Sequence, residues 1–248
     1  MPAAASTIEL ADTGERILPP AEGEVSVVFA GHLVAYRFAA DLADGRDVLD
    51  VGAGAGYGAA TLGERARSVL GVDRDAGAVA YARSHFAGPG VEFREMDASD
   101  LSGLDRRFDL VVSFQVIEHL ADPGAFLDDL RRLVRPGGAI VITTPNVRRA
   151  RGGANPFHES EMSHAEFDAL LASRFEDYDL LGVDFARPSA LRSMVERLPF
   201  YQWLGRRLRR GSALKKAAVR AMALDQYRVI EDHVARDATD LLAVCRPG

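Results

Sequence analysis

The feature that most constrains the fold is a glycine-rich stretch that follows a short apolar segment. Residues 47–51 are largely apolar with Asp50 near their end, and the sequence Gly-Ala-Gly-Ala-Gly-Tyr-Gly follows at residues 52–58. Helix-forming residues come next, and a second apolar segment at residues 68–72 leads into Asp73. This order predicts a strand, a tight turn, a helix and a second strand, with a carboxylate where each strand ends.

The glycines and the second acid together predict a nucleoside-binding site. Glycine lets the backbone turn sharply and approach a ligand where a Cβ atom would collide. The first turn of the following helix presents unpaired N–H groups. Asp73 lies about 20 residues beyond the glycines, a spacing typical of an acid that binds a ribose.

Asp50 narrows the identity of the nucleoside. Gly54 and Gly56, with Ala59, also fit the loose pattern G-x-G-x-x-G/A, which leaves a dinucleotide oxidoreductase as an alternative. A carboxylate just before the glycines disfavours that alternative, because it repels a pyrophosphate but suits a ligand with an ammonium and a sulfonium group. The acid-x-Gly-x-Gly-x-Gly turn resembles motif I of the class I S-adenosylmethionine-dependent methyltransferases, whose places are taken here by Asp50, Gly52, Gly54 and Gly56.

Further segments resemble the same family in the same order. Residues 108–114, FDLVVSF, predict a strand buried on both faces, and residues 118–120, EHL, follow its end. Residues 133–146, LVRPGGAIVITTPN, then predict the end of a helix, a turn and a fifth strand. The resemblance is continuous from about residue 47 to residue 145 and looser elsewhere.

The resemblance implies S-adenosylmethionine as the cofactor and S-adenosylhomocysteine as the product. In the family, an acid and an apolar residue after the third strand border the adenine, and Asp97 and Ala98 match that pair. A structural alternative is that Asp97 caps the turn at residues 99–101. Tyr36, in a helix ahead of the first strand, is a further candidate contact. The residues assigned to the cofactor are Asp50, Gly52, Ala53, Gly54, Gly56, Asp73, Arg74, Asp97, Ala98 and Gln115.

The fold implied is α/β, with a doubly wound seven-stranded sheet, the Rossmann-like methyltransferase fold whose last strand is antiparallel. Residues 1–26 are expected to form an N-terminal loop or lid, in which Thr13-Gly14-Glu15-Arg16 lies over the cofactor or forms a plain turn. Residues 27–186 and 238–248 are expected to form the cofactor-binding domain. Residues 187–237, between strands six and seven, are too many for a bare loop and predict a helical cap over the acceptor.

Two histidines and a glutamate are candidates for chemistry at the acceptor. Glu118 and His119 follow the fourth strand, whose end faces the ligand crevice of an open α/β sheet. His158 lies in a polar segment after the fifth strand. A hydroxyl acceptor must lose a proton, and histidine is the side chain best matched to that task at neutral pH. Either histidine can instead have a packing role, and His32 and His85, in helices expected near the surface, are assigned structural roles.

The acceptor is predicted to be a sugar. Asn155-Pro156-Phe157-His158-Glu159, with Thr144-Pro145-Asn146 and the tetrad at residues 13–16, resembles a subgroup common among bacterial polysaccharide and glycoside methyltransferases. That resemblance implies an O-methyltransferase acting on a hydroxyl of a sugar, glycan or glycoside, with a place in polysaccharide biosynthesis. The alternatives are a methyltransferase with an amine or a small aromatic or quinone-like acceptor, and a non-catalytic cofactor-binding protein.

No metal site is predicted. Mg²⁺ can lower the pKa of a hydroxyl, so metal assistance stays open. Glu231-Asp232-His233 and Asp128-Asp129 offer oxygen ligands, but their spacing matches no recognisable site.

The composition limits which partners the chain can bind and which cellular compartment suits it. The net charge of −6 disfavours bulk nucleic-acid binding, because that affinity depends on cations meeting phosphates. A single cysteine, Cys245, excludes a disulfide framework and favours a reducing compartment. Residues 1–9 lack a signal peptide's features and no apolar run is long enough to span a bilayer, so we expect a cytoplasmic protein without stable membrane insertion. The expected partner is a small-molecule or oligosaccharide acceptor, and a homodimer stays open.

Basic side chains gather in the predicted cap between residues 206 and 220, after the aromatic Phe200, Tyr201 and Trp203. They predict either the solvated face of an amphipathic helix or a surface for an acidic glycan, a phosphorylated acceptor or an anionic membrane.

Overall fold

The computed structural model describes residues 10, 17–18, 26–149, 158–185, 227–230, 236 and 238–248. Their helices are α1 (Val27–Leu42), α2 (Tyr57–Gly63), α3 (Ala76–Phe86), α4 (Pro123–Leu133) and α5 (His164–Ala172), with 3-10 turns η1 (Ile117–His119) and η2 (Val147–Arg149). Their strands are β1 (Asp47–Val51), β2 (Ser68–Asp73), β3 (Val91–Glu95), β4 (Phe108–Phe114), β5 (Val134–Pro145), β6 (Tyr178–Phe185), β7 (Tyr227–Ile230) and β8 (Asp240–Cys245). Most of the predicted cap, including its basic segment, lies outside these residues, as does the tetrad at residues 13–16.

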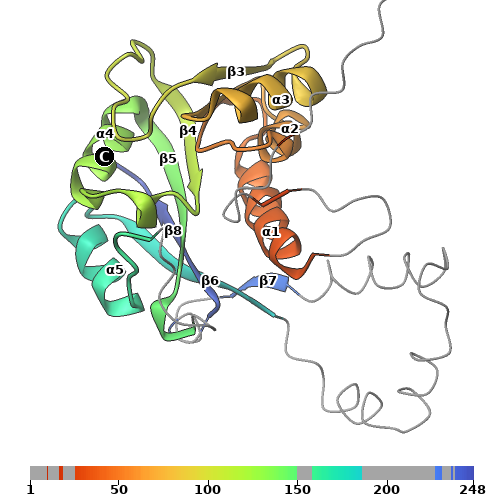
Figure 1. Cartoon of the computed structure of the whole chain (residues 1–248). Coiled ribbons are helices and arrows are strands. Elements are labelled where there is room, and N and C mark those ends of the chain that lie inside the picture. The colour runs from red at the N-terminus through yellow and green to blue at the C-terminus, as the bar shows by residue number, and fades with distance from the viewer. Residues whose placement is uncertain are drawn as a thin grey trace, which may run out of the picture.

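One sheet forms the centre of the molecule, in the order β3-β2-β1-β4-β5-β8-β6-β7 (Figure 1). β1 pairs in parallel with β2 and β4, and the parallel pairs β2–β3 and β4–β5 extend the sheet on either side. The order therefore reverses between β1 and β4, which creates the crevice where ligands bind in open α/β sheets. The doubly wound α/β fold predicted from the sequence is confirmed.

The sheet has eight strands where the sequence predicted seven. β8 is antiparallel to both β5 and β6, as predicted for the last strand. β7 lies within the residues assigned to the helical cap, and it adds an antiparallel edge strand through pairs from Gly182–Ile230 to Phe185–Tyr227. It covers backbone groups that β6 would otherwise present unpaired at the sheet edge. Because β7 has only four residues, no alternating pattern separates it from the rest of the insertion.

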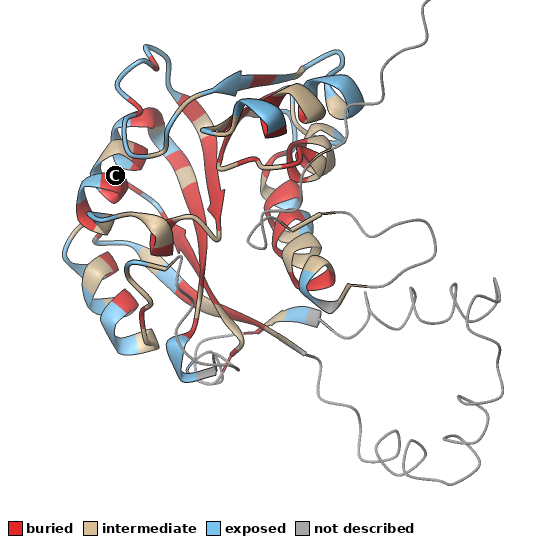
Figure 2. Cartoon of the chain, in the orientation of Figure 1, coloured by how far each residue is buried: buried red, intermediate tan, exposed pale blue. Residues whose placement is uncertain are grey.

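Helices cover both faces of the sheet and divide the core in two, with α1, α2 and α3 on one side and α4 and α5 on the other (Figure 1). Alternate residues of a strand point to opposite faces. Leu49 and Val51 of β1 belong to the core beneath α4 and α5, whereas Val48 belongs to the core beneath α1. Asp50 points to the same side as Val48, toward Tyr36 of α1. Burial is accordingly concentrated along the central strands and the inner sides of the helices (Figure 2).

Side-chain caps fix the start of α4 and α5. At α5, Ser163 Oγ accepts a hydrogen bond from Glu166 N at 3.4 Å while the Glu166 carboxylate accepts one from Ser163 N at 2.8 Å, and this reciprocal pair is a capping box. At α4, Asp122 accepts from Ala125 N at 2.9 Å and Pro123 occupies the first turn. The cap at Asp122 fixes the chain just after η1, whose residues approach the crevice.

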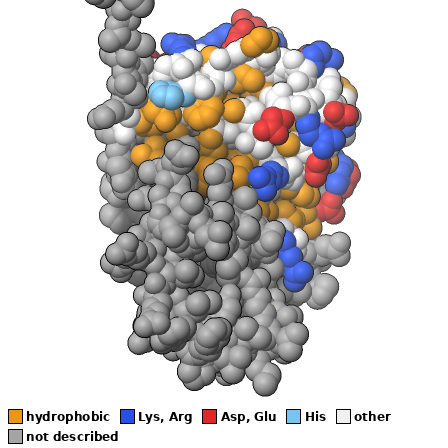
Figure 3. All heavy atoms as spheres, turned by 90° about the vertical axis from the view of Figure 1, so that its right-hand side faces the viewer, with side chains coloured by type: hydrophobic (Ala, Val, Ile, Leu, Met, Phe, Trp, Pro, Cys, Tyr) orange, Lys and Arg blue, Asp and Glu red, His pale blue; other side chains and the backbone are white. Residues whose placement is uncertain are grey.

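Apolar side chains gather on the described part of the face seen in Figure 3. Val28, at the start of α1, has 62% of its surface exposed. None of the helices in the described part of the chain combines the length and the apolar character that a membrane crossing requires.

Candidate active site

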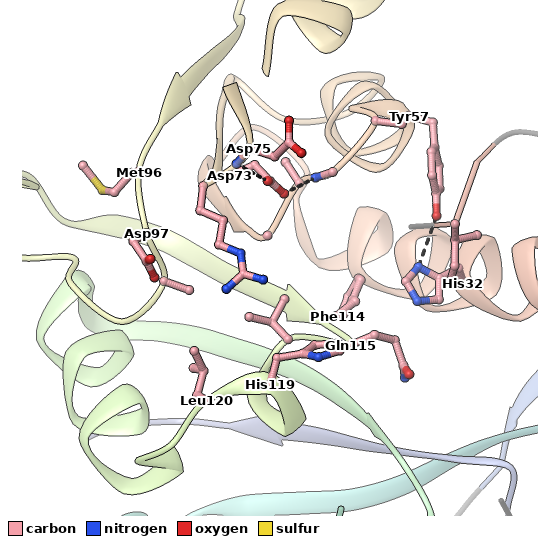
Figure 4. Close-up of a pocket in the computed structure, with 18 of the residues that line it drawn as sticks. His32, Tyr57, Asp73, Asp75, Met96, Asp97, Phe114, Gln115, His119 and Leu120 are labelled. Atoms are coloured by element: carbon pink, nitrogen blue, oxygen red, sulfur yellow. Dashed lines mark hydrogen bonds between the residues drawn. The ribbon is translucent and has the colours of Figure 1, made fainter. Parts of the chain in front are cut away.

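A cavity opens at the carboxyl ends of the parallel strands, where the strand order reverses. Four loops line it: residues 52–55 after β1, residues 73–75 after β2, residues 96–98 after β3 and residues 114–116 after β4. Figure 4 shows residues of these loops arranged around one space, with His119 at its edge. The sequence predicted the site at this position of the sheet.

The loop after β1 presents backbone rather than side chains to the cavity. Gly52 N and Ala53 N both donate to the Val72 carbonyl, at 2.8 and 2.9 Å, which folds the loop back toward β2. Gly52 has a φ of +80°, and the Val116 side chain occupies the space that a Cβ would need there. Gly54 has a φ of +53°, and no atom lies within 4 Å of a Cβ built on it, although it lines the cavity. A ligand can therefore approach the backbone closely at Gly54.

Asp73 is fixed at the cavity wall by two backbone donors. Its Oδ2 accepts from Gly54 N at 2.8 Å and its Oδ1 accepts from Asp75 N at 2.9 Å (Figure 4). Each carboxylate oxygen can accept more than one hydrogen bond, so Asp73 keeps capacity for the hydroxyls of a ribose. A fixed acid beside a bare backbone loop fits a nucleoside cofactor.

Asp97 caps a turn and also lines the cavity. Its Oδ1 accepts from both the backbone N and the Oγ of Ser99 at 2.8 Å, which caps the turn that follows. These bonds hold the pKa of Asp97 below its usual value, with the nearby Arg74 adding to the effect. Asp97 also lines the cavity together with Ala98 and Arg74, on the side toward β3.

Gln115 has an unusual backbone conformation at the end of β4. It is the one non-glycine residue in the described chain with a positive φ, +57°. Its backbone N donates to the Thr143 carbonyl at 3.1 Å, and its Nε2 donates to Thr143 Oγ1 at 3.4 Å. Left-handed conformations of such residues are costly and concentrate at functional sites. Gln115, which the sequence assigns to the cofactor, lines the cavity, but no sequence pattern indicates its conformation.

Two of the residues assigned to the cofactor lie behind the cavity wall. Asp50 is fully buried and accepts hydrogen bonds from Tyr36 Oη, 3.3 Å from each carboxylate oxygen. Burial, with the charge of Asp73, raises the pKa of Asp50 to about 7 although the bond from Tyr36 lowers it. A Cβ on Gly56 would lie 2.6 Å from that of Ala82, so Gly56 serves the packing of the loop against α3.

His32 is a cavity residue that the sequence interpretation missed. We expected it near the surface in a structural role, but it lines the cavity from α1 (Figure 4). Its Nδ1 lies 3.1 Å from Tyr57 Oη, and its Nε2 is buried without a hydrogen-bond partner among the described residues. Burial lowers the pKa of His32 to about 4, so the ring is neutral near pH 7. The helical spacing of apolar residues puts His32 on the polar side of α1, which is normally exposed to solvent. That side faces the cavity because α1 packs over the strand ends.

The three candidate catalytic side chains meet at one place. Glu118, His119 and His158 each offer a ligand atom, and these atoms all lie within 4.8 Å of one another. His119 lines the cavity from η1, and its ring centroid is 4.9 Å from that of His158. Glu159 N and Ser160 N both donate to the Glu118 carbonyl, at 2.9 and 3.0 Å, which holds the segment of His158 against η1. We name these three residues the acceptor cluster.

The electrostatics of the acceptor cluster are dominated by buried acids. Burial raises the pKa of Glu118 to about 8, and the charges of Asp240 and Glu161 add to this, while hydrogen bonds including that from Thr144 oppose it. Asp240, at the start of β8, has a pKa raised to about 7, chiefly by burial. His158 Nδ1 lies 2.8 Å from Glu161 Oε1, so a carboxylate orients its imidazole ring.

The strand order, the glycine loop and the acid at the end of β2 together define a Rossmann-like methyltransferase fold. A family described as "Methyltransferase domain" matches residues 49–142. A "probable S-adenosylmethionine-dependent methyltransferase" of Mycolicibacterium smegmatis is 41% identical over 176 residues, which are 69% of this chain and 67% of that relative. A ubiquinone biosynthesis O-methyltransferase of Azorhizobium caulinodans is 36% identical over 104 residues, 41% of each chain.

Among solved structures, an S-adenosylmethionine-dependent methyltransferase of Thermotoga maritima, described as a possible histamine N-methyltransferase, superposes with a TM-score of 0.60. The identity is 16%, and the match covers 90% of this chain and 91% of that one, so it shows a shared fold. The chain belongs to the S-adenosylmethionine-dependent methyltransferases. Its cofactor is S-adenosylmethionine, which the bare backbone at Gly54 and the fixed carboxylate of Asp73 suit.

Proposed function

We propose that this methyltransferase transfers a methyl group to a hydroxyl of a sugar, glycan or glycoside. The observation that carries the proposal is the acceptor cluster, in which two imidazoles and a carboxylate converge at the edge of the cofactor cavity. An amine that is already neutral can be methylated without a base, whereas a hydroxyl is a poor nucleophile until its proton leaves. A cluster of this kind is thus most useful for a hydroxyl acceptor.

The residues around the cavity have distinct roles toward the cofactor in this proposal. Asp73 binds the ribose hydroxyls, and Asp97 with Ala98 borders the adenine. Gly52, Ala53 and Gly54 supply the backbone against which the methionine part lies, while Gly56 shapes the loop from behind. Arg74 and Gln115 complete the wall, and Asp50 favours the positively charged end of the cofactor from its buried position.

The segments at the open side of the cavity are assigned to the acceptor. Ile17, which directly follows the tetrad at residues 13–16, lines the cavity, and this supports a lid role for residues 1–26. Residues 187–237, where they are not part of β7, are proposed to cover the acceptor. The resemblance of residues 155–159 to sugar methyltransferases supports a sugar as that acceptor.

Bound S-adenosylmethionine supplies an electrophilic methyl carbon, whose bond to sulfur breaks with the electron pair left on sulfur as the acceptor oxygen bonds to the carbon. The chain holds the two reactants in line, and such positioning can correspond to effective molarities on the order of 10⁵ M or more. Glu118, His119 and His158 promote loss of the hydroxyl proton. His119 is the member of the cluster that reaches the cavity wall, so the hydroxyl lies next to it.

A phenolic or quinone-like hydroxyl is the second candidate acceptor. It is favoured by the relative named as a ubiquinone biosynthesis O-methyltransferase, although that match covers only 41% of this chain. Both candidates require deprotonation of a hydroxyl, so the acceptor cluster has the same role in each.

The acceptor class is tested by incubating the full chain with S-adenosylmethionine labelled on its methyl group. The panel contains mono- and oligosaccharides, phenols and amines, each with a control lacking protein. We expect label on a sugar hydroxyl. Label confined to phenols would select the second candidate, and label confined to amines would contradict both.

Replacing His158 with alanine is expected to lower turnover while leaving cofactor affinity almost unchanged. A positioned group that promotes proton removal contributes about 10²–10⁴-fold to a rate, and His158 is not part of the cavity wall that the cofactor contacts. Turnover is measured with the best acceptor of the panel, and affinity by calorimetry with S-adenosylhomocysteine. His85→Ala is the matched control, because His85 is exposed on α3 and stacks on Tyr81. Loss of cofactor binding in His158→Ala would contradict the assignment.

A further inference from the structure

The acceptor cluster has the composition of a metal site as well as that of a proton acceptor. Two imidazole nitrogens and one carboxylate oxygen meet at one point beside the cavity. We propose that Glu118, His119 and His158 bind one divalent transition-metal ion at the acceptor end of the cavity. The binding site stands on geometry alone, and only the part that the ion has in the reaction rests on the proposed function.

The distances suit an ion of this kind. The three ligand atoms lie within 4.8 Å of one another. Bonds to a metal such as zinc are about 2.0–2.2 Å long for both nitrogen and oxygen ligands, so each atom needs to move inward by less than about 1 Å. Side-chain rotations of His119 and Glu118 on the short η1 turn can supply such a movement without a change in the fold.

Glu118 gives an independent indication of a cation. Its side chain is fully buried, and its Oε1 accepts no hydrogen bond from any residue that the structure describes. Its Oε2 accepts a long bond of 3.4 Å from Thr144 Oγ1. No Lys or Arg in the described chain forms an ion pair with Glu118, whereas Arg67 and Arg135 both form ion pairs with the acids Asp47 and Asp109. Buried carboxylates are normally paired or bound to metals, and a metal ion at this point would give Glu118 Oε1 the partner that it lacks among the described residues.

His158 is held as a metal-binding histidine usually is. Glu161 Oε1 lies 2.8 Å from His158 Nδ1, which places a carboxylate against one of the two ring nitrogens. A carboxylate that accepts from the other ring nitrogen of a ligand histidine fixes the tautomer and strengthens metal binding. The two backbone bonds to the Glu118 carbonyl, from Glu159 N and Ser160 N, lock the separation between η1 and the segment of His158.

The ligand types indicate which ions bind. Mg²⁺ and Ca²⁺ prefer sets made of oxygen alone. Imidazole nitrogen favours zinc, iron, nickel and copper, and two histidines with one carboxylate leave further positions open on a first-row ion. We therefore expect Zn²⁺ and Co²⁺ to bind at least tenfold more tightly than Mg²⁺.

The open positions give the ion a part in the proposed reaction. His119 lines the cavity, so an ion bound to it lies where an acceptor hydroxyl arrives. A coordinated hydroxyl loses its proton more easily, as water does on zinc, and the proton then passes to solvent. In this arrangement the histidines act as ligands, and the hydroxyl of the acceptor completes the coordination.

The test measures metal binding to the full chain without any acceptor. After treatment with EDTA and dialysis, Co²⁺ is added and its visible absorption recorded, and Zn²⁺ and Mg²⁺ are titrated by calorimetry. We expect one ion of Zn²⁺ or Co²⁺ per chain, with affinity reduced at least tenfold in Glu118→Gln and His158→Asn, and about 10–100-fold in Glu161→Gln. His85→Ala serves as the control and keeps the wild-type affinity. Binding of S-adenosylhomocysteine to each variant shows that the cofactor domain is folded.

The outcomes separate the metal site from the proposed function. Co²⁺ that binds wild type but not the cluster variants supports the site even when no sugar is methylated. Equal affinities in wild type, His158→Asn and Glu118→Gln overturn the site, because the ion is then held elsewhere. Sugar methylation at full rate in EDTA, with no Co²⁺ spectrum, overturns the site and leaves the sugar methyltransferase assignment standing.

Discussion

Replacing Gly54 with alanine is expected to abolish most cofactor binding while leaving the chain folded. Gly54 has a φ of +53°, and a Cβ built there meets no protein atom within 4 Å. The left-handed conformation costs an alanine about 1–2 kcal/mol, which for a chain of this size lowers the melting temperature by only a few degrees. The added methyl group projects from the cavity wall where the cofactor must approach the backbone. We expect the dissociation constant of S-adenosylhomocysteine to rise at least tenfold, equivalent to about 1.4 kcal/mol.

Gly56→Ala is the matched control, because its expected effects fall on stability. Gly56 has a φ of +89° and does not line the cavity, and a Cβ there would lie 2.6 Å from Ala82 Cβ and 3.0 Å from Phe93 Cζ. Overpacking and backbone strain together are expected to cost about 2–5 kcal/mol. Thermal unfolding and calorimetry on both variants check the contrast. A Gly54→Ala protein that binds the cofactor as wild type does would show that the ligand lies elsewhere in the cavity.

The local elements were predictable because local patterns determine them. The apolar segment before Gly52, the capping box of Ser163 with Glu166, and the pair Asp122-Pro123 each specify the start or end of an element within a few residues. The order of these elements then restricts the sheet to the doubly wound arrangement, because parallel neighbours need helical crossovers of one hand. The cavity follows from the sheet, since ligands bind where the strand order reverses.

The composition of the site was predictable only in part, because it depends on contacts between distant segments. Glu118 and His158 were each identified from their positions after strands, but their convergence depends on backbone bonds from residues 159 and 160 to the Glu118 carbonyl. No spacing in the sequence predicts that contact. His32 was misplaced because a helical pattern shows which side is polar but not what that side faces. Asp50 was assigned to the cofactor, but it is fully buried. Whether an acid at the end of a strand contacts a ligand or lies behind the cavity wall depends on the direction in which its side chain points.

Asp50→Asn is expected to stabilise the cofactor-free chain above pH 7 and to weaken its binding of S-adenosylmethionine. The buried Asp50 carboxyl has a pKa of about 7, well above its ordinary value near 4, so the folded chain binds this proton more tightly than the unfolded chain does. The free energy of unfolding therefore falls as the pH rises from about 4 to about 7, and the loss is on the order of 4 kcal/mol. Asparagine stays neutral throughout and does not incur that loss.

Cofactor binding responds in the opposite direction. The sulfonium and ammonium charges of S-adenosylmethionine favour the ionised form of Asp50, so wild-type affinity is expected to rise between pH 5 and pH 8, with release of a proton on binding. Asp50→Asn should bind S-adenosylmethionine at least about tenfold more weakly at pH 8, and its affinity should depend less on pH. A tenfold change corresponds to about 1.4 kcal/mol, which is a modest value for one buried charge interaction. Calorimetry in buffers of different ionisation enthalpy measures the released proton directly.

Tyr36→Phe distinguishes the effect of Asp50 from that of the other buried acids. Glu118 and Asp240 also have raised pKa values, so they contribute a fall in stability with pH to every variant. Tyr36 Oη donates to both oxygens of Asp50 and so favours its charged form. Without that hydroxyl the pKa of Asp50 rises further, and the decline in unfolding free energy between pH 5 and pH 8 should steepen, whereas in Asp50→Asn it should flatten. If the unfolding free energy of wild type and of both variants changed with pH in the same way, Asp50 would not titrate between pH 5 and pH 8.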